Sequence, residues 1–146
     1  MSIGGKIARL DPLRDTLFNV NAFGDAIPSA RFMGGREFEI LMCKDQMAPT
    51  KKEITRVLRQ KVTLSHSVVA HSGPFQGKNF KWSVSESELT KGERAAVVSL
   101  YLAMMALTCL KLSGAEGPTW VEGPFIDNKL FLDLIAAKSV EDVLLS

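Results

Sequence analysis

The sequence predicts a single α/β domain, in which an antiparallel meander of strands is followed by a mixed sheet with helices. Residues 17–23 alternate between apolar side chains and asparagine, as a strand with one buried face does. Ala95 to Leu112 is an almost unbroken apolar run, composed mostly of good helix formers. The β-prone run Thr119–Val121 then ends in a glycine turn before a second helix, and this order forms an α/β unit.

The composition is that of an ordinary soluble globule. The chain has 146 residues, of which 46% are hydrophobic and 23% are charged, enough for one domain with a hydrophobic core. A net charge of +2 and the lack of a basic cluster argue against a nucleic-acid partner. Cys43 and Cys109 lie in apolar settings far apart in the sequence, so we predict that both are core residues of a reduced protein. The start of the chain has no apolar region typical of a signal peptide, and we predict a cytoplasmic location.

The first quarter of the chain predicts three antiparallel strands, at 6–10, 17–23 and 26–32. In the second strand Phe18 and Val20 share the face that we expect to be buried. Pro28 places the third strand at an edge or a bulge, because proline donates no ladder hydrogen bond.

Two helices and two β-like runs are predicted next. Helical spacing of apolar residues predicts a helix over 36–43, and Thr50 with Glu53 forms a capping-box pattern that starts another. Residues 62–70 and 79–84 are β-like. Five cations lie on the second helix, and we interpret them as a solvent-exposed face, with an anion-binding face as the alternative: Lys51, Lys52, Arg56, Arg59 and Lys61.

The apolar run from Ala95 to Leu112 is predicted to be the central helix. Thr90 and Glu93 form a second capping box at its start, and Gly114 is a left-handed stop. The helix would span roughly 30 Å and is apolar nearly all round, so other elements should cover it. A membrane span is the competing interpretation. We favour a buried helix because the mean hydropathy is only +0.08 and no second apolar segment exists.

The chain shows few residues arranged for catalysis. His66 and His71 lack ligand-spaced partners, so we predict loop histidines and no metal site. Glu37 and Glu39 are two apart and would not face each other on a helix. Asp127 is interpreted as the N-cap of the helix that starts near 128.

Three glycine turns remain as candidate ligand contacts, because glycine allows close approach of a ligand or a backbone. They are Gly34-Gly35, Gly73-Pro74-Phe75 and Gly123-Pro124-Phe125. The third is the best placed, since it joins a predicted parallel strand to a helix, although a plain βα turn would have the same spacing. Residues 139–146 are ambiguous between a short helix and a strand.

Four stretches together resemble the FGGY family of carbohydrate kinases, and they cover nearly the whole chain. The first runs from Asn19 to Glu39 and includes Met33-Gly34-Gly35-Arg36-Glu37. The second is Ser72-Gly73-Pro74-Phe75, similar to the loop that precedes the family's long helix. The third lies within 92–110 and looks like that helix. The fourth, Val121-Glu122-Gly123-Pro124-Phe125 with Asn128 and Leu130, lies where the family has its adenosine-binding glycine turn.

The resemblance implies a ribonuclease H-like, actin-like ATPase fold and assigns adenosine contacts to Gly123, Pro124 and Asn128. Glu122 and Pro124 occupy positions that are often glycine in the family. The cofactors implied are ATP and Mg²⁺. The aspartate base and a first phosphate loop would belong to an N-terminal kinase domain, so no catalytic residue is expected in this chain. We therefore interpret residues 1–146 as an incomplete C-terminal domain, the nucleotide side of a two-domain sugar kinase.

The resemblance also implies the reaction of the intact enzyme, transfer of the γ-phosphoryl group of MgATP to a hydroxyl of a ketose or polyol. The chain alone is predicted to be inactive. It is also expected to bind neither nucleic acid nor membrane, and its exposed apolar surface could make it self-associate. The main alternative is a non-catalytic interaction domain that retains the actin-like fold, and a small membrane-anchored protein is a weaker one.

Overall fold

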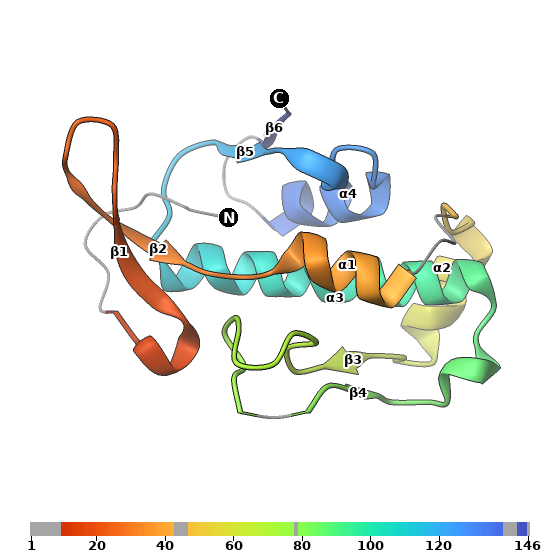
Figure 1. Cartoon of the computed structure of the whole chain (residues 1–146). Helices are drawn as coiled ribbons and strands as arrows, with labels where there is room; N and C mark the ends of the chain where they lie inside the picture. The colour runs from red at the N-terminus through yellow and green to blue at the C-terminus, as the bar shows by residue number, and fades with distance from the viewer. Residues whose placement is uncertain (1–9, 43–46, 78, 139–142, 146) are drawn as a thin grey trace.

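Helix α3 (Lys91–Leu112) lies at the centre of the molecule, and the other elements pack around it (Figure 1). The computed structural model describes residues 10–42, 47–77, 79–138 and 143–145. Helices α1 (Gly34–Met42), α2 (Lys51–Arg59) and α4 (Lys129–Lys138) each contact α3. In Figure 1 α4 lies on one side of α3 and the β3–β4 hairpin on the other.

The capping box predicted for α3 is confirmed. The Thr90 Oγ1 accepts a hydrogen bond from the Glu93 amide at 3.1 Å, and the Thr90 amide donates to Glu93 Oε2 at 2.9 Å. Gly114 follows the helix with φ of +62°, as the predicted left-handed stop requires. Both signals lie within a few residues of the helix ends, so they can be detected in the sequence.

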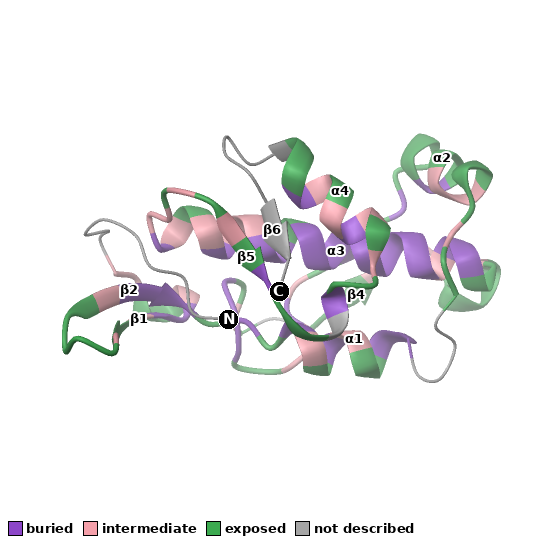
Figure 2. Ribbon diagram, turned by 90° about the horizontal axis from the view of Figure 1, so that it is seen from above, coloured by how far each residue is buried: buried purple, intermediate pink, exposed green. Residues whose placement is uncertain are grey.

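Burial of α3 supports the interpretation as a core helix. Of the helices that the structure describes, only α3 is long and apolar enough to cross a membrane, and 61% of its most apolar 18-residue stretch is buried inside the protein. Leu102 and Val98 are fully buried, and Figure 2 shows buried residues along most of the helix. The core also includes Phe32, Val57 and Phe131 from the elements around it.

In the described part of the chain, six strands form three separate two-stranded pairs. Strands β1 (Thr16–Val20) and β2 (Ala26–Ala30) are antiparallel, with Phe18 opposite Pro28. Strands β3 (Leu64–Ser65) and β4 (Lys81–Trp82) are also antiparallel. Strands β5 (Thr119–Val121) and β6 (Val143–Leu145) are parallel. The described residues also include three short 3₁₀ turns: η1 (Pro12–Arg14), η2 (Glu86–Glu88) and η3 (Gly123–Phe125).

The predicted burial of one face of the strand at 17–23 was wrong. Phe18 is 50% exposed and Val20 is 65% exposed. The β1–β2 hairpin extends away from α3 at one end of the molecule, so only its base, including Thr16 and Ala30, is buried (Figure 1). Alternation in a sequence shows that two faces differ, but it does not show that another element covers one of them.

Other sequence predictions also change in the structure. Gly34 and Gly35 are the first residues of α1 rather than a turn. The β-like run at 62–70 contains only the short strand β3, because His66 has φ of +66° and turns the chain out of the strand. The strand predicted at 6–10 falls almost entirely outside the described residues, as does Cys43. The ambiguous C-terminal stretch is a strand over Val143–Leu145.

Candidate functional site

The turn between β5 and α4 has the position predicted for the candidate site. β5 is paired in parallel with β6, and the 3₁₀ turn η3 follows its carboxyl end. Gly123 has φ of +80° and is exposed, and in the described part of the chain no atom lies within 4 Å of where its Cβ would be. Glycine therefore provides both the left-handed backbone and an open approach to it. This is the place where α/β folds commonly bind ligands.

Phe125 anchors this turn in the core. Its ring stacks on Phe131 of α4 at a centroid distance of 4.9 Å and meets Phe38 of α1 edge-on at 5.9 Å. Gly34 lies directly beneath, because a Cβ there would be 3.2 Å from Phe125 Cζ and 2.8 Å from Phe32 Cε1. Of the predicted glycine pair, Gly34 thus contributes to the site through close packing against the turn, whereas no described atom lies within 4 Å of the Cβ position of Gly35.

Asn128, rather than the predicted Asp127, caps helix α4. Its Oδ1 accepts a hydrogen bond from the Phe131 amide at 3.0 Å, the pattern of an N-cap side chain. Asp127 is exposed, one residue before the cap. Asparagine and aspartate are about equally good N-caps, so the sequence alone could not choose between neighbours.

The Asn128 side chain also contacts α3. Ser99 Oγ lies 3.0 Å from Asn128 Nδ2, 3.2 Å from Asn128 Oδ1 and 2.9 Å from the Ala95 carbonyl oxygen. A hydroxyl has a single proton, so the consistent arrangement has Ser99 donate to Ala95 and accept from Asn128 Nδ2. The second Nδ2 proton is not used by Ser99. Two of the three predicted site residues therefore face different ways. The Gly123 backbone is exposed to solvent, whereas the Asn128 side chain contacts α3.

The charges beside the turn are acidic. Glu122 and Asp127 are both exposed and flank the turn on either side. Their carboxylates would repel a nearby polyphosphate, but they would not disfavour an uncharged nucleoside.

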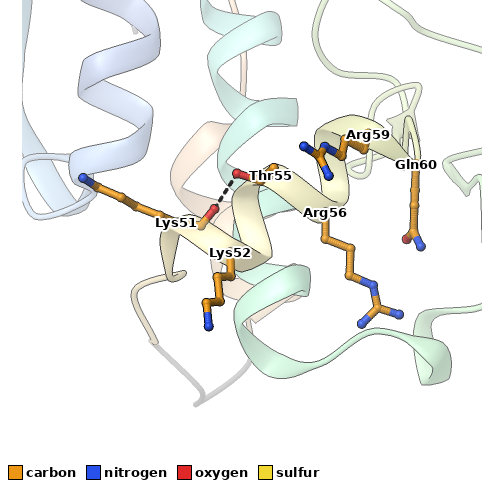
Figure 3. A pocket seen from close by; sticks show the side chains of 6 residues that line it. All are labelled: Lys51, Lys52, Thr55, Arg56, Arg59 and Gln60. Carbon is orange, nitrogen blue, oxygen red and sulfur yellow. Dashed lines mark hydrogen bonds between the residues drawn. The ribbon is translucent and has the colours of Figure 1, made fainter.

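Two hollows lie away from this turn. One, of about 450 Å³, is lined by residues of α2 and the next residue, whose long side chains spread outward (Figure 3): Lys51, Lys52, Thr55, Arg56, Arg59 and Gln60. The four cations are exposed, as predicted for a solvent-facing surface of α2, whereas Lys61, predicted on the same helix, lies in the turn after it with φ of +51°. The other, of about 570 Å³, is an apolar groove between α2, α3 and β3 that includes Leu58, Leu100 and Met104.

Glu37 is a buried carboxylate that sequence reasoning missed. It is 0% exposed, its Oε2 accepts from Tyr101 Oη at 2.6 Å, and its Oε1 accepts from the Val69 amide at 3.1 Å. Burial raises the pKa of Glu37 above its usual value, although these hydrogen bonds partly oppose the shift. In the sequence Glu37 has only Glu39 as a nearby carboxylate, whereas its partners in the structure lie in α3 and in the loop after β3.

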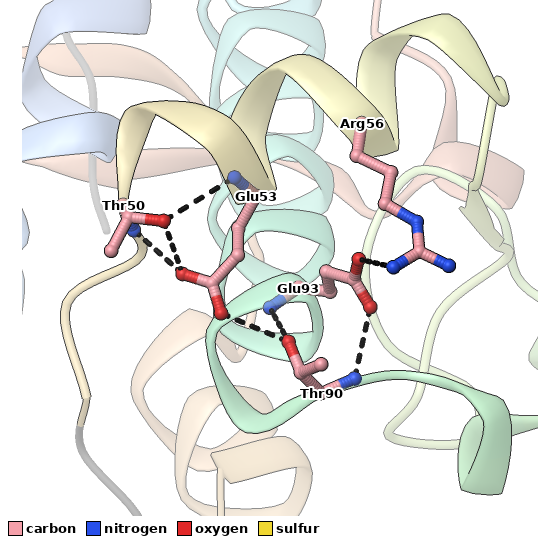
Figure 4. Close-up of polar contacts among 5 residues, drawn as sticks. All are labelled: Thr50, Glu53, Arg56, Thr90 and Glu93. Atoms are coloured by element: carbon pink, nitrogen blue, oxygen red, sulfur yellow. Dashed lines mark hydrogen bonds and ion pairs between the residues drawn. The ribbon is translucent and has the colours of Figure 1, made fainter.

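A second polar cluster joins α2 to the start of α3 (Figure 4). Glu53 accepts hydrogen bonds from Thr50 of its own capping box and also from Thr90 Oγ1, at 2.9 Å. Glu93, the reciprocal member of the α3 box, is buried and forms an ion pair with Arg56 at 3.0 Å. The two capping boxes are therefore interlocked, which two separate sequence motifs did not reveal.

The remaining residues considered as ligand or metal contacts either hold the fold together or lie in loops. Gly73 is buried with φ of +79°, and its amide donates to Asp15 Oδ2 at 2.9 Å, which fixes the loop at 72–75 to the base of the β1–β2 hairpin. His66 and His71 lie in loops, as predicted. Within the described ranges, no three His, Cys, Asp or Glu side chains are grouped to hold a metal ion.

Comparison with known proteins identifies the family. The model of the C-terminal domain of FGGY carbohydrate kinases matches residues 1–146. Among solved structures, a carbohydrate kinase from Novosphingobium aromaticivorans is similar with a TM-score of 0.79 and 33% identity. The match covers 94% of this chain and 31% of that one, so this chain spans about a third of that kinase. A search of curated proteins finds no significant match.

These matches confirm the resemblance found in the sequence and the predicted α/β class, the ribonuclease H-like fold of actin-like ATPases. The structural similarity covers 94% of the chain, and the family model matches all of it. The chain therefore belongs to the FGGY family of carbohydrate kinases and corresponds to its C-terminal domain.

Proposed function

We propose that this chain is the nucleotide-side domain of an ATP-dependent carbohydrate kinase. The intact enzyme would transfer the γ-phosphoryl group of MgATP to a hydroxyl of a ketose or polyol. Family membership over residues 1–146 supports the kinase assignment. The observation that carries the nucleotide assignment is the open, left-handed Gly123 at the carboxyl end of the parallel strand β5.

We assign the adenosine contacts to Gly123, Pro124 and Asn128. Gly123 has no side chain, so the adenosine could lie directly on the backbone. Pro124 has no amide proton, so its backbone can accept a hydrogen bond from the nucleoside but cannot donate one. The second Nδ2 proton of Asn128 is available as a donor, because Ser99 uses only one. The acidic side chains of Glu122 and Asp127 would direct the phosphates away from the turn.

The chemistry of transfer would depend on groups outside these residues. Phosphoryl transfer relies on positioning and on neutralising the phosphate charge, which Mg²⁺ supplies when it is bound with ATP. We propose that an N-terminal kinase domain provides the base and a phosphate loop, and that the sugar lies between the two domains. The chain by itself would then bind adenosine weakly, because half of the cleft is missing, and would not phosphorylate sugars. A cytoplasmic location fits this role.

The first test is an NMR titration of the chain with adenosine. We expect small, saturable shifts at the amides of Gly123 and Asn128, and their loss in Gly123→Val, whose side chain would fill the open approach. Gly77→Val is a matched control, because Gly77 also has positive φ, +78°, and also has no atom within 4 Å of its Cβ position. Equal shifts in the wild type and Gly123→Val would contradict the adenosine assignment.

The second test is an ADP-release assay on the purified chain with a panel of ketoses and polyols. We expect no sugar-dependent turnover. Turnover that persists through further purification, and that is lost when a residue of this chain is changed, would show that the chain is catalytic alone. A chain that shows neither turnover nor adenosine shifts would favour the alternative of an interaction domain that keeps the fold without the chemistry.

A further inference from the structure

Ser99 is a polar residue in a part of α3 that is otherwise apolar. It is 3% exposed, and its neighbours along the helix, Val98 and Leu100, are aliphatic. Serine is a poorer helix former than alanine, and a buried hydroxyl must be hydrogen-bonded to avoid a desolvation cost. Ser99 meets that need within α3 through the Ala95 carbonyl oxygen at 2.9 Å. Its contact with Asn128 is therefore additional to what the hydroxyl itself requires.

Thr108 provides an internal comparison. Its Oγ1 donates to the Met104 carbonyl oxygen at 2.7 Å, which is the same contact four residues back along the same helix. Within the described residues, that hydroxyl has no further hydrogen bond to another element. Ser99 is more deeply buried than Thr108, and it also accepts a hydrogen bond of 3.0 Å from Asn128 Nδ2. The comparison separates the local role of a helix hydroxyl from a role between α3 and α4.

The candidate adenosine turn is fixed at two points, and both lie beyond Gly123. Phe125 is fixed by its aromatic contacts with Phe38 and Phe131. Asn128 is fixed by Ser99, and it in turn holds the first turn of α4 through the Phe131 amide. The aromatic contacts hold Phe125 in the core, with preferred ring geometries that are broader than that of a hydrogen bond. The directional hydrogen bond of Asn128 restricts the orientation more closely.

We propose that Ser99 is a positioning residue for the adenosine turn. Ser99 orients the Asn128 amide, which caps the first turn of α4, and in this way it fixes the position of the turn that begins at Gly123. This inference rests on the proposed function, since it assigns to Ser99 an effect on nucleoside affinity. Ser99 itself does not touch the ligand.

The test compares Ser99→Ala with Thr108→Ala. Each removes one hydroxyl that bonds four residues back in α3, but only the first removes the contact with Asn128. Alanine is the better helix former, so each variant should lose no more stability than one hydrogen bond contributes. A thermal melt of each variant checks this. Two readouts are measured on the full chain: amide hydrogen exchange, and adenosine affinity by NMR.

We expect Ser99→Ala to speed exchange of the Phe131 amide, whose acceptor is Asn128 Oδ1, and to weaken adenosine binding by about 2- to 10-fold, the effect of one net hydrogen bond. Thr108→Ala should change neither. The Leu132 amide, which donates to the Asn128 carbonyl oxygen, serves as the reference amide.

The outcomes separate this inference from the proposed function. If Gly123→Val abolishes adenosine binding but Ser99→Ala leaves the affinity unchanged, the adenosine turn stands and the role of Ser99 is overturned. Unchanged exchange of the Phe131 amide in Ser99→Ala would also overturn it. If the wild-type chain shows no adenosine shifts, the adenosine assignment fails, and the positioning role fails with it. If Ser99→Ala and Thr108→Ala weakened adenosine binding equally, the effect would be a general one on α3, and the positioning role of Ser99 would be overturned.

Discussion

Thr90 Oγ1 donates a hydrogen bond to Glu53 Oε1 at 2.9 Å, and this contact joins the N-termini of two helices. Each residue already belongs to a capping box of its own helix. Hydrogen bonds from Thr50 and then from Thr90 lower the pKa of Glu53. The carboxylate thus caps α2 and accepts from the cap of α3, so α2 is positioned at the start of the central helix by polar contacts as well as by the buried Val57.

The close approach of Glu53 to α3 requires glycine at position 92. A Cβ on Gly92 would overlap both carboxylate oxygens of Glu53. We expect Gly92→Ala to destabilise the fold by about 1–3 kcal/mol, because Glu53 must move away from Thr90. Urea denaturation measures this change.

Gly35→Ala is the matched control for Gly92→Ala. Gly35 is also the second residue of its helix, and no described atom lies within 4 Å of its Cβ position. Alanine there should be neutral or should stabilise the protein by up to about 1 kcal/mol, because it reduces the entropy of the unfolded chain. Equal effects of the two substitutions would show that Glu53 does not restrict position 92.

The buried Glu37 predicts a specific dependence of stability on pH. Its pKa in the folded protein is raised, mainly by burial, above the usual value of 4.5. The folded state therefore holds this proton more tightly than the unfolded state. The stabilisation is fully present below the unfolded pKa and is lost as the pH rises through the folded pKa.

The difference in the free energy of unfolding between the wild type and Glu37→Gln measures the contribution of Glu37, because the other carboxyl groups titrate equally in both proteins. Glutamine resembles the protonated acid and does not ionise. We expect the stability of the wild type relative to Glu37→Gln to decrease as the pH rises from about 4, near the reference pKa of glutamate, through the raised pKa of the folded state. Parallel stability profiles from urea denaturation would show that Glu37 ionises as freely in the folded protein as in the unfolded one.

The central position of α3 predicts that substitution by alanine destabilises the protein more at buried positions of this helix than at exposed ones. Leu102 is fully buried, whereas Met104 is 64% exposed. We expect Leu102→Ala to cost about 2–5 kcal/mol through lost burial and a residual cavity. Met104→Ala should cost much less, because most of its side chain remains in water in the folded protein. Chemical denaturation that gave similar losses for both would show that α3 is not the centre of the core.

Cys109 should be unreactive in the folded protein. It is fully buried in α3, and burial raises the pKa of its thiol to about 12. The thiolate is the reactive form, so alkylation at pH 8 should leave Cys109 unmodified. Peptide mapping by mass spectrometry, with a urea-unfolded sample as the control, checks this prediction. Rapid labelling of Cys109 in the native sample would mean that α3 opens readily.

Much of the fold could be predicted from the sequence, because its signals are local. The two capping boxes, the left-handed Gly114 and the β5–η3–α4 unit all depend on residues within a few positions of one another. The family resemblance likewise rests on short motifs, and the comparisons confirm it. The candidate turn at Gly123 lies where the sequence placed it, at the end of a parallel strand.

Only the tertiary structure showed which distant residues meet. Glu37 and Tyr101 are 64 residues apart, Glu53 and Thr90 are 37 apart, and Ser99 and Asn128 are 29 apart. The exposure of Phe18 and Val20 was equally invisible, because burial of a strand face depends on what packs against it. Local patterns lie within one or two helical turns or a short strand, so they can be recognised in the sequence. Two polar groups far apart in the sequence become partners only when packing removes both from water.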